Sequence, residues 1–348
     1  MQIRRSLLAC VLFVLFVVVP LAASGEQAAP RIPIVYCTDL FHPHGDPDDH
    51  FDLATLFALP ELDVRAIVID MGREGEGRPG LLTVRQMTHL TGRGVPTATG
   101  LASNLDSLED TGRGQPPESQ AGVALILDAL RAADEPVTVF ITGSLRDFAA
   151  AYNRAPDLVR EKVGRCYVNA GHSSGGAEWN VQLDPVAFVR IMRSGLPIYW
   201  VPCFGDGGYE SLWTFDHEEV LEGLPGPIQN FFLYALDKTD PAQVDPIAAL
   251  GAPVSAERKA RFWKEKRNMW CTAAFLHAAG REQGPFTFER ARVKVEDNGK
   301  TTPALNEEGV ALHVLRVDDS VNYRGYMAGT LRDLLAGLPL AATASAEE

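Results

Sequence analysis

The chain has no excess of basic residues: 32 Lys and Arg stand against 45 Asp and Glu, which gives a formal net charge of −13. Binding to a nucleic-acid backbone requires a concentrated basic face, and no cluster of Lys and Arg along the sequence supplies one. The composition therefore argues against a nucleic acid as a partner. A metal ion or a small molecule is compatible with the acidic balance.

Cysteine is scarce as well, with five residues in 348, and no CxxC pair or His-x-x-x-His spacing predicts a zinc site. Four cysteines follow the N-terminal segment, at Cys37, Cys166, Cys203 and Cys271, and they are far apart in the sequence. Three of them lie in or beside apolar runs that are typical of strands. An oxidising compartment permits disulfides, but we expect small, buried, unpaired side chains.

No hydrophobic run is long enough to span a bilayer, because the longest, at about residues 7–19, falls short of the roughly 20 residues required. This run follows Arg4 and Arg5 and precedes small residues at 21–24, a pattern typical of a cleaved export signal. The alternative is an uncleaved anchor helix. We expect a signal peptide at 1–24, an exported mature protein in the periplasm or outside the cell, and no stable membrane insertion after cleavage.

The rest of the chain has ordinary globular composition, with 46% hydrophobic and 22% charged residues. Short apolar runs that predict strands alternate with segments of helical periodicity. Strands are predicted at 34–37, 64–69, 137–141, 165–169 and 198–201, and helices at 51–59, 81–90, 145–152 and 185–194. The later part predicts helices at 228–238, 259–279 and 323–335 and antiparallel strands within 286–315.

This alternation predicts an α/β fold, in which helices cover both faces of a mostly parallel sheet. Small strand and helix additions are expected in the C-terminal third. We expect one domain at 32–338, followed by a flexible tail at 339–348.

Five aspartates crowd the stretch after the first predicted strand: Asp39, Asp46, Asp48, Asp49 and Asp52. In a parallel sheet, the carboxyl ends of the strands are where ligands bind. Carboxylates this close together require a compensating cation or proton. Oxygen ligands suit Ca²⁺ or Mg²⁺, and a loop that also offers backbone carbonyls favours Ca²⁺. The alternative is capping of the helix expected near residue 51, which needs one or two of the five.

These residues resemble a known family, the calcium-dependent nucleoside N-ribohydrolases, or inosine-uridine preferring hydrolases. Family members have a first strand ending in Asp-x-Asp and then Asp-Asp opening an apolar helix, and Thr38-Asp39 and Asp48-Asp49 are similar. A related branch has a longer Asp-Pro-Asp-Asp form, which residues 46–49 match. Further similar segments follow in the family's order: Thr-Gly-Ser-Leu-Arg-Asp at 142–147, Ala-Glu-Trp-Asn-Val-Gln-Leu-Asp-Pro at 177–185 and Val-Asp-Pro-Ile-Ala at 244–248. The resemblance covers residues 34–335, and its Ala-Glu-Trp-Asn segment is the most specific part.

The resemblance implies a Rossmann-like nucleoside hydrolase fold and cleavage of the N-glycosidic bond of ribonucleosides or a related riboside. It implies a Ca²⁺ ion held by Asp39, Asp49, Asp245 and the backbone carbonyl of Thr142. Asp39 is then also the base that takes a proton from the attacking water. Asp46 has no counterpart in the shorter family motif and is a candidate to replace or supplement Asp39.

The resemblance also implies that Asp48, Glu178 and Asn180 grip the sugar hydroxyls. The chemistry agrees, because carboxylates beside the ring stabilise an oxocarbenium-like transition state. The expected partner is a small-molecule riboside, and the sequence leaves a homo-oligomer open.

The chain departs from the family at several positions. Cys37 replaces the first Asp of Asp-x-Asp, Val244 replaces a His, the Asn after the second strand is absent, and the loop before Asp46 is longer. The candidates for the leaving-group acid are His172, His217 and Asp206, each more readily explained as structural. Two other functions therefore stay open: a non-catalytic carbohydrate- or riboside-binding protein on the same scaffold and, less favoured, a metal phosphatase.

Overall fold

The computed structural model describes residues 31–72, 79–281, 283–303, 308–318 and 320–342. Residues 31–348 form one compact unit, and the predicted signal peptide at 1–24 lies outside the described residues. None of the described helices is both long and apolar enough to cross a bilayer.

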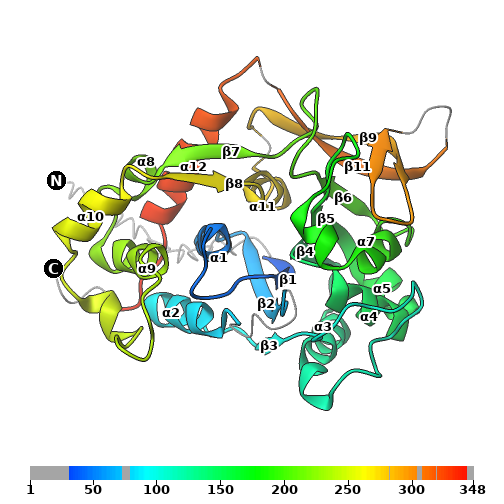
Figure 1. Ribbon diagram of the computed structural model, residues 1–348, viewed down its shortest axis with the longest axis horizontal. Coiled ribbons are helices and arrows are strands. Elements are labelled where there is room, and N and C mark those ends of the chain that lie inside the picture. Colours follow the sequence, from blue (N-terminus) through cyan, green and yellow to red (C-terminus); the bar gives the residue numbers. More distant parts are fainter. Residues whose placement is uncertain (1–30, 73–78, 282, 304–307, 319, 343–348) are drawn as a thin grey trace, which may run out of the picture. The chain divides into compact units, whose positions relative to one another are not determined.

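A nine-stranded sheet runs through the described part of the chain in the order β10-β9-β11-β6-β5-β4-β1-β2-β3 (Figure 1). The strands from β11 to β3 in this order are parallel, and β9 runs antiparallel to both β11 and β10. The mostly parallel α/β sheet is thus confirmed. The bounds are β1 Ile32–Thr38, β2 Leu62–Ile69, β3 Thr97–Thr99, β4 Val137–Thr142, β5 Val163–Asn169, β6 Ile198–Val201, β9 Phe286–Val295, β10 Thr301–Pro303 and β11 Val310–Val317.

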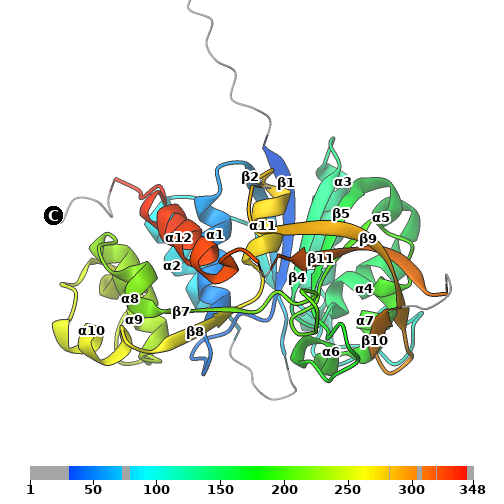
Figure 2. The ribbon, with the colours of Figure 1, turned by 90° about the horizontal axis from the view of Figure 1, so that it is seen from above.

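Helices cover both faces of the sheet, as Figures 1 and 2 show. One hydrophobic cluster joins α1, α2, α9, α11 and α12 to one face, and another joins α3, α4, α5 and α7 to the opposite face. The bounds are α1 Asp48–Ala58, α2 Leu81–Thr91, α3 Ala121–Ala132, α4 Arg146–Arg154, α5 Pro156–Lys162, α6 Trp179–Leu183, α7 Pro185–Met192, α8 His217–Leu221, α9 Gly226–Leu236, α10 Ala256–Phe262, α11 Thr272–Ala278 and α12 Tyr323–Ala336.

The strand β1 shows why the sheet is central. Ile34 and Tyr36 pack into one cluster, Val35 and Cys37 pack into the other, and all four are buried. Successive side chains of a strand point to opposite faces, so a strand covered on both sides needs an unbroken apolar run. The sequence of β1 has this run, which is why it was recognisable as a strand.

The order of the strands in the sheet determines where a ligand-binding crevice can form. Reading outward from β1, the chain adds β2 and β3 on one side and then crosses to add β4, β5 and β6 on the other. The loops that leave β1 and β4 therefore diverge and open a crevice at the carboxyl edge, where ligands bind in sheets of this kind. Thr38, Thr142 and Asn169 end three neighbouring strands at this edge.

The predicted helix at 259–279 is wrong. The structure has α10, then the strand β8 (Lys266–Met269), then α11. β8 pairs antiparallel with β7 (Trp213–Asp216), and its burial alternates, with Arg267 and Met269 inside. Lys266 and Arg267 are adjacent charged residues in a strand of only four residues, so the sequence shows no alternation of apolar and polar side chains there.

The elements β3, α3, α5, α6, β7 and α8 were not predicted from the sequence. The antiparallel strands predicted within 286–315 are confirmed, since β9 pairs antiparallel with both β10 and β11. β11 also lies parallel to β6 and so joins these strands to the main sheet. The four described cysteines are buried and unpaired, as expected. In the predicted tail, the Ala341 amide donates to the Leu90 carbonyl at 2.7 Å.

Candidate active site

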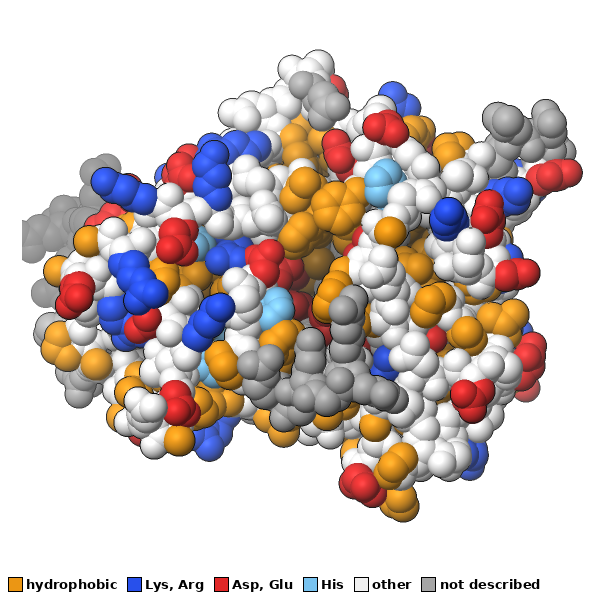
Figure 3. Space-filling model, in the orientation of Figure 1, with side chains coloured by type: hydrophobic (Ala, Val, Ile, Leu, Met, Phe, Trp, Pro, Cys, Tyr) orange, Lys and Arg blue, Asp and Glu red, His pale blue; other side chains and the backbone are white. Residues whose placement is uncertain are grey.

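A cavity of about 340 Å³ opens at the carboxyl edge of the sheet. In the space-filling view it is the central hollow, with acidic and hydrophobic side chains around it (Figure 3). Its lining comes from the loops after β1, β4, β5, β6 and β8 and comprises Asp39, His44, Asp46, Asp48, Asp49, Thr142, Asn169, Glu178, Trp179, Asn180, Cys203, Phe204, Trp270 and Cys271.

One side of the cavity, here called the aspartate wall, is formed by Asp39, Asp48 and Asp49. Asp39 follows β1, and the other two form the first turn of α1. The Oδ1 atom of Asp49 accepts hydrogen bonds from the hydroxyls of Thr38 at 2.7 Å and Thr142 at 3.2 Å. These bonds tie the start of α1 to the ends of β1 and β4. The N-cap of α1 is Pro47 and receives no side-chain cap, so capping does not explain the aspartates.

Burial and mutual repulsion dominate the electrostatics of this wall. Burial, and then the charge of Asp49, raise the pKa of Asp39 and of Asp48 well above the usual value of an aspartate. Burial also raises the pKa of Asp49, although the hydroxyl of Thr38 opposes the shift. A nearby cation stabilises buried carboxylates that repel one another, because a positive charge favours their ionised form.

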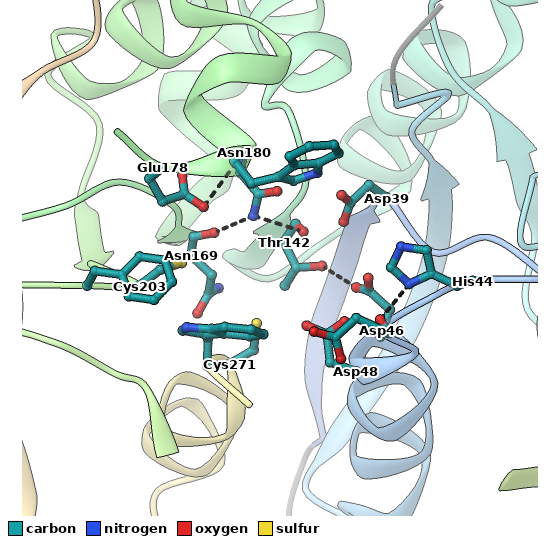
Figure 4. A pocket seen from close by; sticks show the side chains of 14 residues that line it. Asp39, His44, Asp46, Asp48, Thr142, Asn169, Glu178, Asn180, Cys203 and Cys271 are labelled. Atoms are coloured by element: carbon teal, nitrogen blue, oxygen red, sulfur yellow. Dashed lines mark hydrogen bonds between the residues drawn. The ribbon is translucent and has the colours of Figure 1, made fainter. Parts of the chain in front are cut away.

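The opposite side is formed by Asn169, Glu178 and Asn180 and is here called the sugar wall, after the role that the resemblance implies for Glu178 and Asn180. Glu178 is the N-cap of α6 and accepts hydrogen bonds from the backbone amides of residues 171, 180 and 181 at 2.8 to 3.0 Å. The Nδ2 atom of Asn180 donates to the carbonyls of Thr142 at 3.3 Å and Asn169 at 3.0 Å. These contacts fix both side chains, and Figure 4 shows them across the cavity from Asp39 and Asp48.

Asn169 was missed in the sequence, although it ends a predicted strand directly before residues that were expected at this edge. Its side chain is fully buried, and its Nδ2 donates to the carbonyl of Ile141 at 3.3 Å. Its Oδ1 atom has no hydrogen-bond partner among the described residues and lies in a residue that lines the cavity. A buried acceptor without a partner is costly, so a ligand donor is the natural partner for this atom.

The remaining part of the lining is apolar and aromatic. Phe204 and Trp270 meet edge to face with ring centroids 6.0 Å apart, and the buried thiols of Cys203 and Cys271 lie nearby in the lining. The cavity thus has a charged and polar half and an apolar half. Such a division suits a molecule with a hydroxylated part and a flat apolar part.

The structure leaves Asp245 outside the cavity and gives Asp46 a partner of its own. The carboxylate of Asp245 is exposed, does not line the cavity and accepts hydrogen bonds from the amides of Ile247 at 2.9 Å and Ala248 at 2.8 Å. Asp46 lines the cavity, but its carboxylate pairs with Arg267. The fifth aspartate, Asp52, is buried on α1 beneath the lining.

None of the three candidate leaving-group acids lines the cavity. His217 is fully buried, and burial lowers its pKa to about 4, so its ring is neutral. Asp206 is engaged by the hydroxyl of Ser174 at 2.6 Å, and His172 accepts from the Ser174 amide at 3.1 Å. His44 is the one histidine among the described residues that lines the cavity, and the sequence did not single it out as an acid.

The donor chemistry of the aspartate wall fits a hard divalent cation, since Asp39, Asp49 and the Thr142 carbonyl offer only oxygen. In the described part of the chain, no three acidic, histidine or cysteine side chains converge closely enough to coordinate one metal ion. The types of ligand atom therefore suit such an ion, because two carboxylates and one carbonyl belong to residues that line the cavity. Asp245, the fourth ligand that the resemblance implies, lies outside the cavity.

Comparison with known proteins agrees with the fold. The chain is 28% identical over 188 residues to the pyrimidine-specific ribonucleoside hydrolase RihA of Escherichia coli O1:K1, an alignment that covers 48% of this chain and 58% of that protein. The chain thus spans less than two thirds of the length of the curated relatives it matches.

Two solved structures have the same fold. A plant nucleoside hydrolase, PpNRh1, superposes with a TM-score of 0.58 at 18% identity, over 88% of this chain and 99% of that one. The purine-preferring ribonucleoside hydrolase of Gardnerella vaginalis gives a TM-score of 0.58 at 18% identity, over 87% and 99%. The sequence model of the inosine-uridine preferring nucleoside hydrolases matches residues 43–304. Because this match covers well over half of the sequence, the chain belongs to the inosine-uridine preferring nucleoside hydrolase family.

Proposed function

We propose that the chain is an exported hydrolase that cleaves the N-glycosidic bond of ribonucleosides or a closely related riboside. One observation carries the proposal: an aspartate wall and a sugar wall face each other across one cavity, whose remaining lining is apolar and aromatic. Family membership supports the reaction type. The N-terminal sequence pattern supports export.

The sugar wall and Asp48 bind the ribose. The carboxylates of Asp48 and Glu178 accept hydrogen bonds from ring hydroxyls, and the unpartnered Oδ1 of Asn169 gains a donor. Because backbone amides already hold the Glu178 carboxylate and backbone carbonyls already hold the Asn180 side chain, little side-chain freedom is lost on binding. The same carboxylates stabilise the positive charge that develops on the ring as the glycosidic bond lengthens.

The family is typically metal-dependent, and we propose Ca²⁺, held by Asp39, Asp49 and the Thr142 carbonyl, with Asp245 as a further ligand. When bound, this ion supplies a positive charge that acidifies coordinated water and offsets the buried carboxylates. Asp39 takes the proton from the attacking water, whose oxygen bonds to the anomeric carbon. The electrons of the broken carbon–nitrogen bond leave with the base into the half lined by Phe204 and Trp270.

The test is ribose release from a panel of purine and pyrimidine nucleosides, with and without a calcium chelator. We expect turnover of at least one nucleoside, loss of activity with chelator, recovery with added calcium, and a loss of at least about 100-fold in Asp39→Asn. Asp297→Asn, an exposed carboxylate distant from the cavity lining, is the matched control. Absence of turnover on the whole panel, together with indifference to the chelator, would refute the proposal.

A non-catalytic riboside-binding protein is the second candidate, because none of the three predicted leaving-group acids lines the cavity. It predicts saturable binding of nucleosides or ribose by calorimetry without product. Product formation that Asp49→Ala abolishes would eliminate this candidate.

A further inference from the structure

The loop between β1 and α1 carries an ion pair that the proposed chemistry does not use. The carboxylate of Asp46 pairs with the guanidinium of Arg267 on β8, 221 residues away in sequence. The Arg267 side chain is only 8% exposed, whereas that of Asp46 is 44% exposed. We propose that Asp46 and Arg267 form a latch that positions the loop 41–47 against β8 and so sets the spacing of the apolar half of the cavity. The inference rests on the proposed function.

Arg267 has a second partner besides Asp46, the buried ring of His217. Its Nε donates to the Nε2 atom of His217 at 3.3 Å, and the Nδ1 atom of His217 donates to the carbonyl of Phe262 at 2.9 Å. A ring that donates from Nδ1 and accepts at Nε2 is the neutral tautomer, which agrees with its fully buried position. The guanidinium therefore has a fixed direction, and Asp46 docks onto a rigid partner.

The latch joins two parts of the cavity lining that are remote in sequence. On the loop side, His44 and Asp46 line the cavity, and the Nδ1 atom of His44 donates to the carbonyl of Asp46 (Figure 4). On the other side, Trp270 and Cys271 directly follow β8 and also line the cavity. An ion pair between the loop and β8 therefore fixes the distance between His44 and Trp270.

The proposed metal ligand Asp49 and the sugar wall are anchored separately from the latch. Asp49 is held by the hydroxyls of Thr38 and Thr142, and Glu178 is held by backbone amides of its own loop. Neither anchor involves Asp46 or Arg267. Asp48 alone of the sugar contacts is joined to the loop, because its amide donates to the Asp46 carbonyl at 2.9 Å. Releasing the latch should therefore disturb the half that holds the leaving group more than it disturbs ribose binding. This makes Asp46 a positioning residue and explains an acid that the family motif lacks.

The experiment compares wild type, Asp46→Ala, Arg267→Met and the double variant, with Asp297→Ala as the control, because it breaks the Arg193–Asp297 pair outside the cavity. KM and kcat are measured for the best nucleoside, and Ki is measured for D-ribose as competitive inhibitor. We expect each single variant to raise KM about tenfold, to lower kcat less, and to change the ribose Ki less than about twofold. The double variant should be no worse than the worse single variant, since both remove the same contact.

Asp46→Asn keeps an acceptor for Arg267 and should recover part of the lost affinity. Because Asp46 is half-exposed, its variants should fold even if Arg267→Met does not. An unchanged KM, a ribose Ki that rises in parallel with KM, or additive effects in the double variant would overturn the latch.

The failure of the proposed function is recognised separately, as a wild-type protein that hydrolyses no nucleoside. In that case the latch is decided by thermal unfolding of the same four proteins. Non-additive shifts of the unfolding midpoint would support the pair, and additive shifts would overturn it.

Discussion

Arg146 offers the sharpest test of how the site is supported. Its side chain is 1% exposed and lies beneath the carboxyl edge of the sheet. Its guanidinium pairs with Asp184 at 3.3 Å and Asp70 at 3.7 Å, and donates to Asn104 at 2.7 Å. It also donates to the carbonyls of Leu101 at 3.2 Å and Leu183 at 3.1 Å. One side chain thus connects the end of β2, the loop after β3 and the junction of α6 and α7.

We predict that Arg146→Met lowers the free energy of unfolding by about 3 kcal/mol. Removing one partner of a buried ion pair costs about 3–5 kcal/mol, because the remaining charge is left buried without compensation. The lower end applies here, because each carboxylate keeps two amide donors: Asp184 those of Leu105 and Ala187, and Asp70 those of Gly72 and Ser144. Against a typical total of about 5–15 kcal/mol, the loss is large.

The assay is urea unfolding followed by circular dichroism, in the presence of chelator so that metal binding adds no stability. Arg131→Met is the matched control, because Arg131 pairs with Asp128 at 2.8 Å but both side chains are more than half exposed, at 57% and 71%. The control should lose less than about 0.5 kcal/mol. If Arg146→Met loses less than about 1 kcal/mol, the reasoning about the buried network is refuted.

Three further outcomes are expected. Asp49→Asn should weaken calcium binding, measured by calorimetry, by at least about tenfold. Asp245→Asn should weaken it less, because Asp245 is exposed and lies outside the cavity. Equal losses would show that the loop of Asp245 closes onto the cavity. Burial raises the pKa of Asp147 to about 7, above its value in the unfolded chain, so the wild-type protein loses stability as pH rises from about 4 to 7. In Asp147→Asn this loss should be smaller, by up to about 4 kcal/mol in urea unfolding. An identical pH dependence in both proteins would contradict this. Asn169→Ala should reduce kcat/KM by about 100-fold with a small change in unfolding midpoint, because its Oδ1 makes no internal hydrogen bond; unchanged kinetics would remove it from the sugar wall.

Where the local pattern was strong, the sequence predicted the elements well. β1, β2, β4, β5 and β6 were recognisable because burial on both faces leaves an uninterrupted apolar run. β8 was not recognisable, because its identity as a strand depends on pairing with β7, about 50 residues earlier in the chain, as the His217–Arg267 contact also shows. A strand of four residues carries too few side chains to reveal its period without its partner.

The candidate site divides in the same way. The sequence placed Asp39, Asp48 and Asp49 together, because neighbours within one loop stay close in any fold. It also placed Glu178 and Asn180 at the cavity, through the segment that resembles the family. It gave no indication that the Oδ1 atom of Asn169 would lack a hydrogen-bond partner, since that depends on what packs around it.

The sequence by itself determined the α/β architecture and the acidic, oxygen-rich character of the site, because apolar periodicity and clustered carboxylates are local properties. Only the tertiary structure decided which of these acids share the cavity. It paired Asp46 with Arg267, buried the Arg146 network and left Asp245 exposed. Each of these results depends on contacts between residues far apart in the chain, and no local pattern specifies such contacts. The charge of Asp46 was visible in the sequence, and its partner was visible only in the fold.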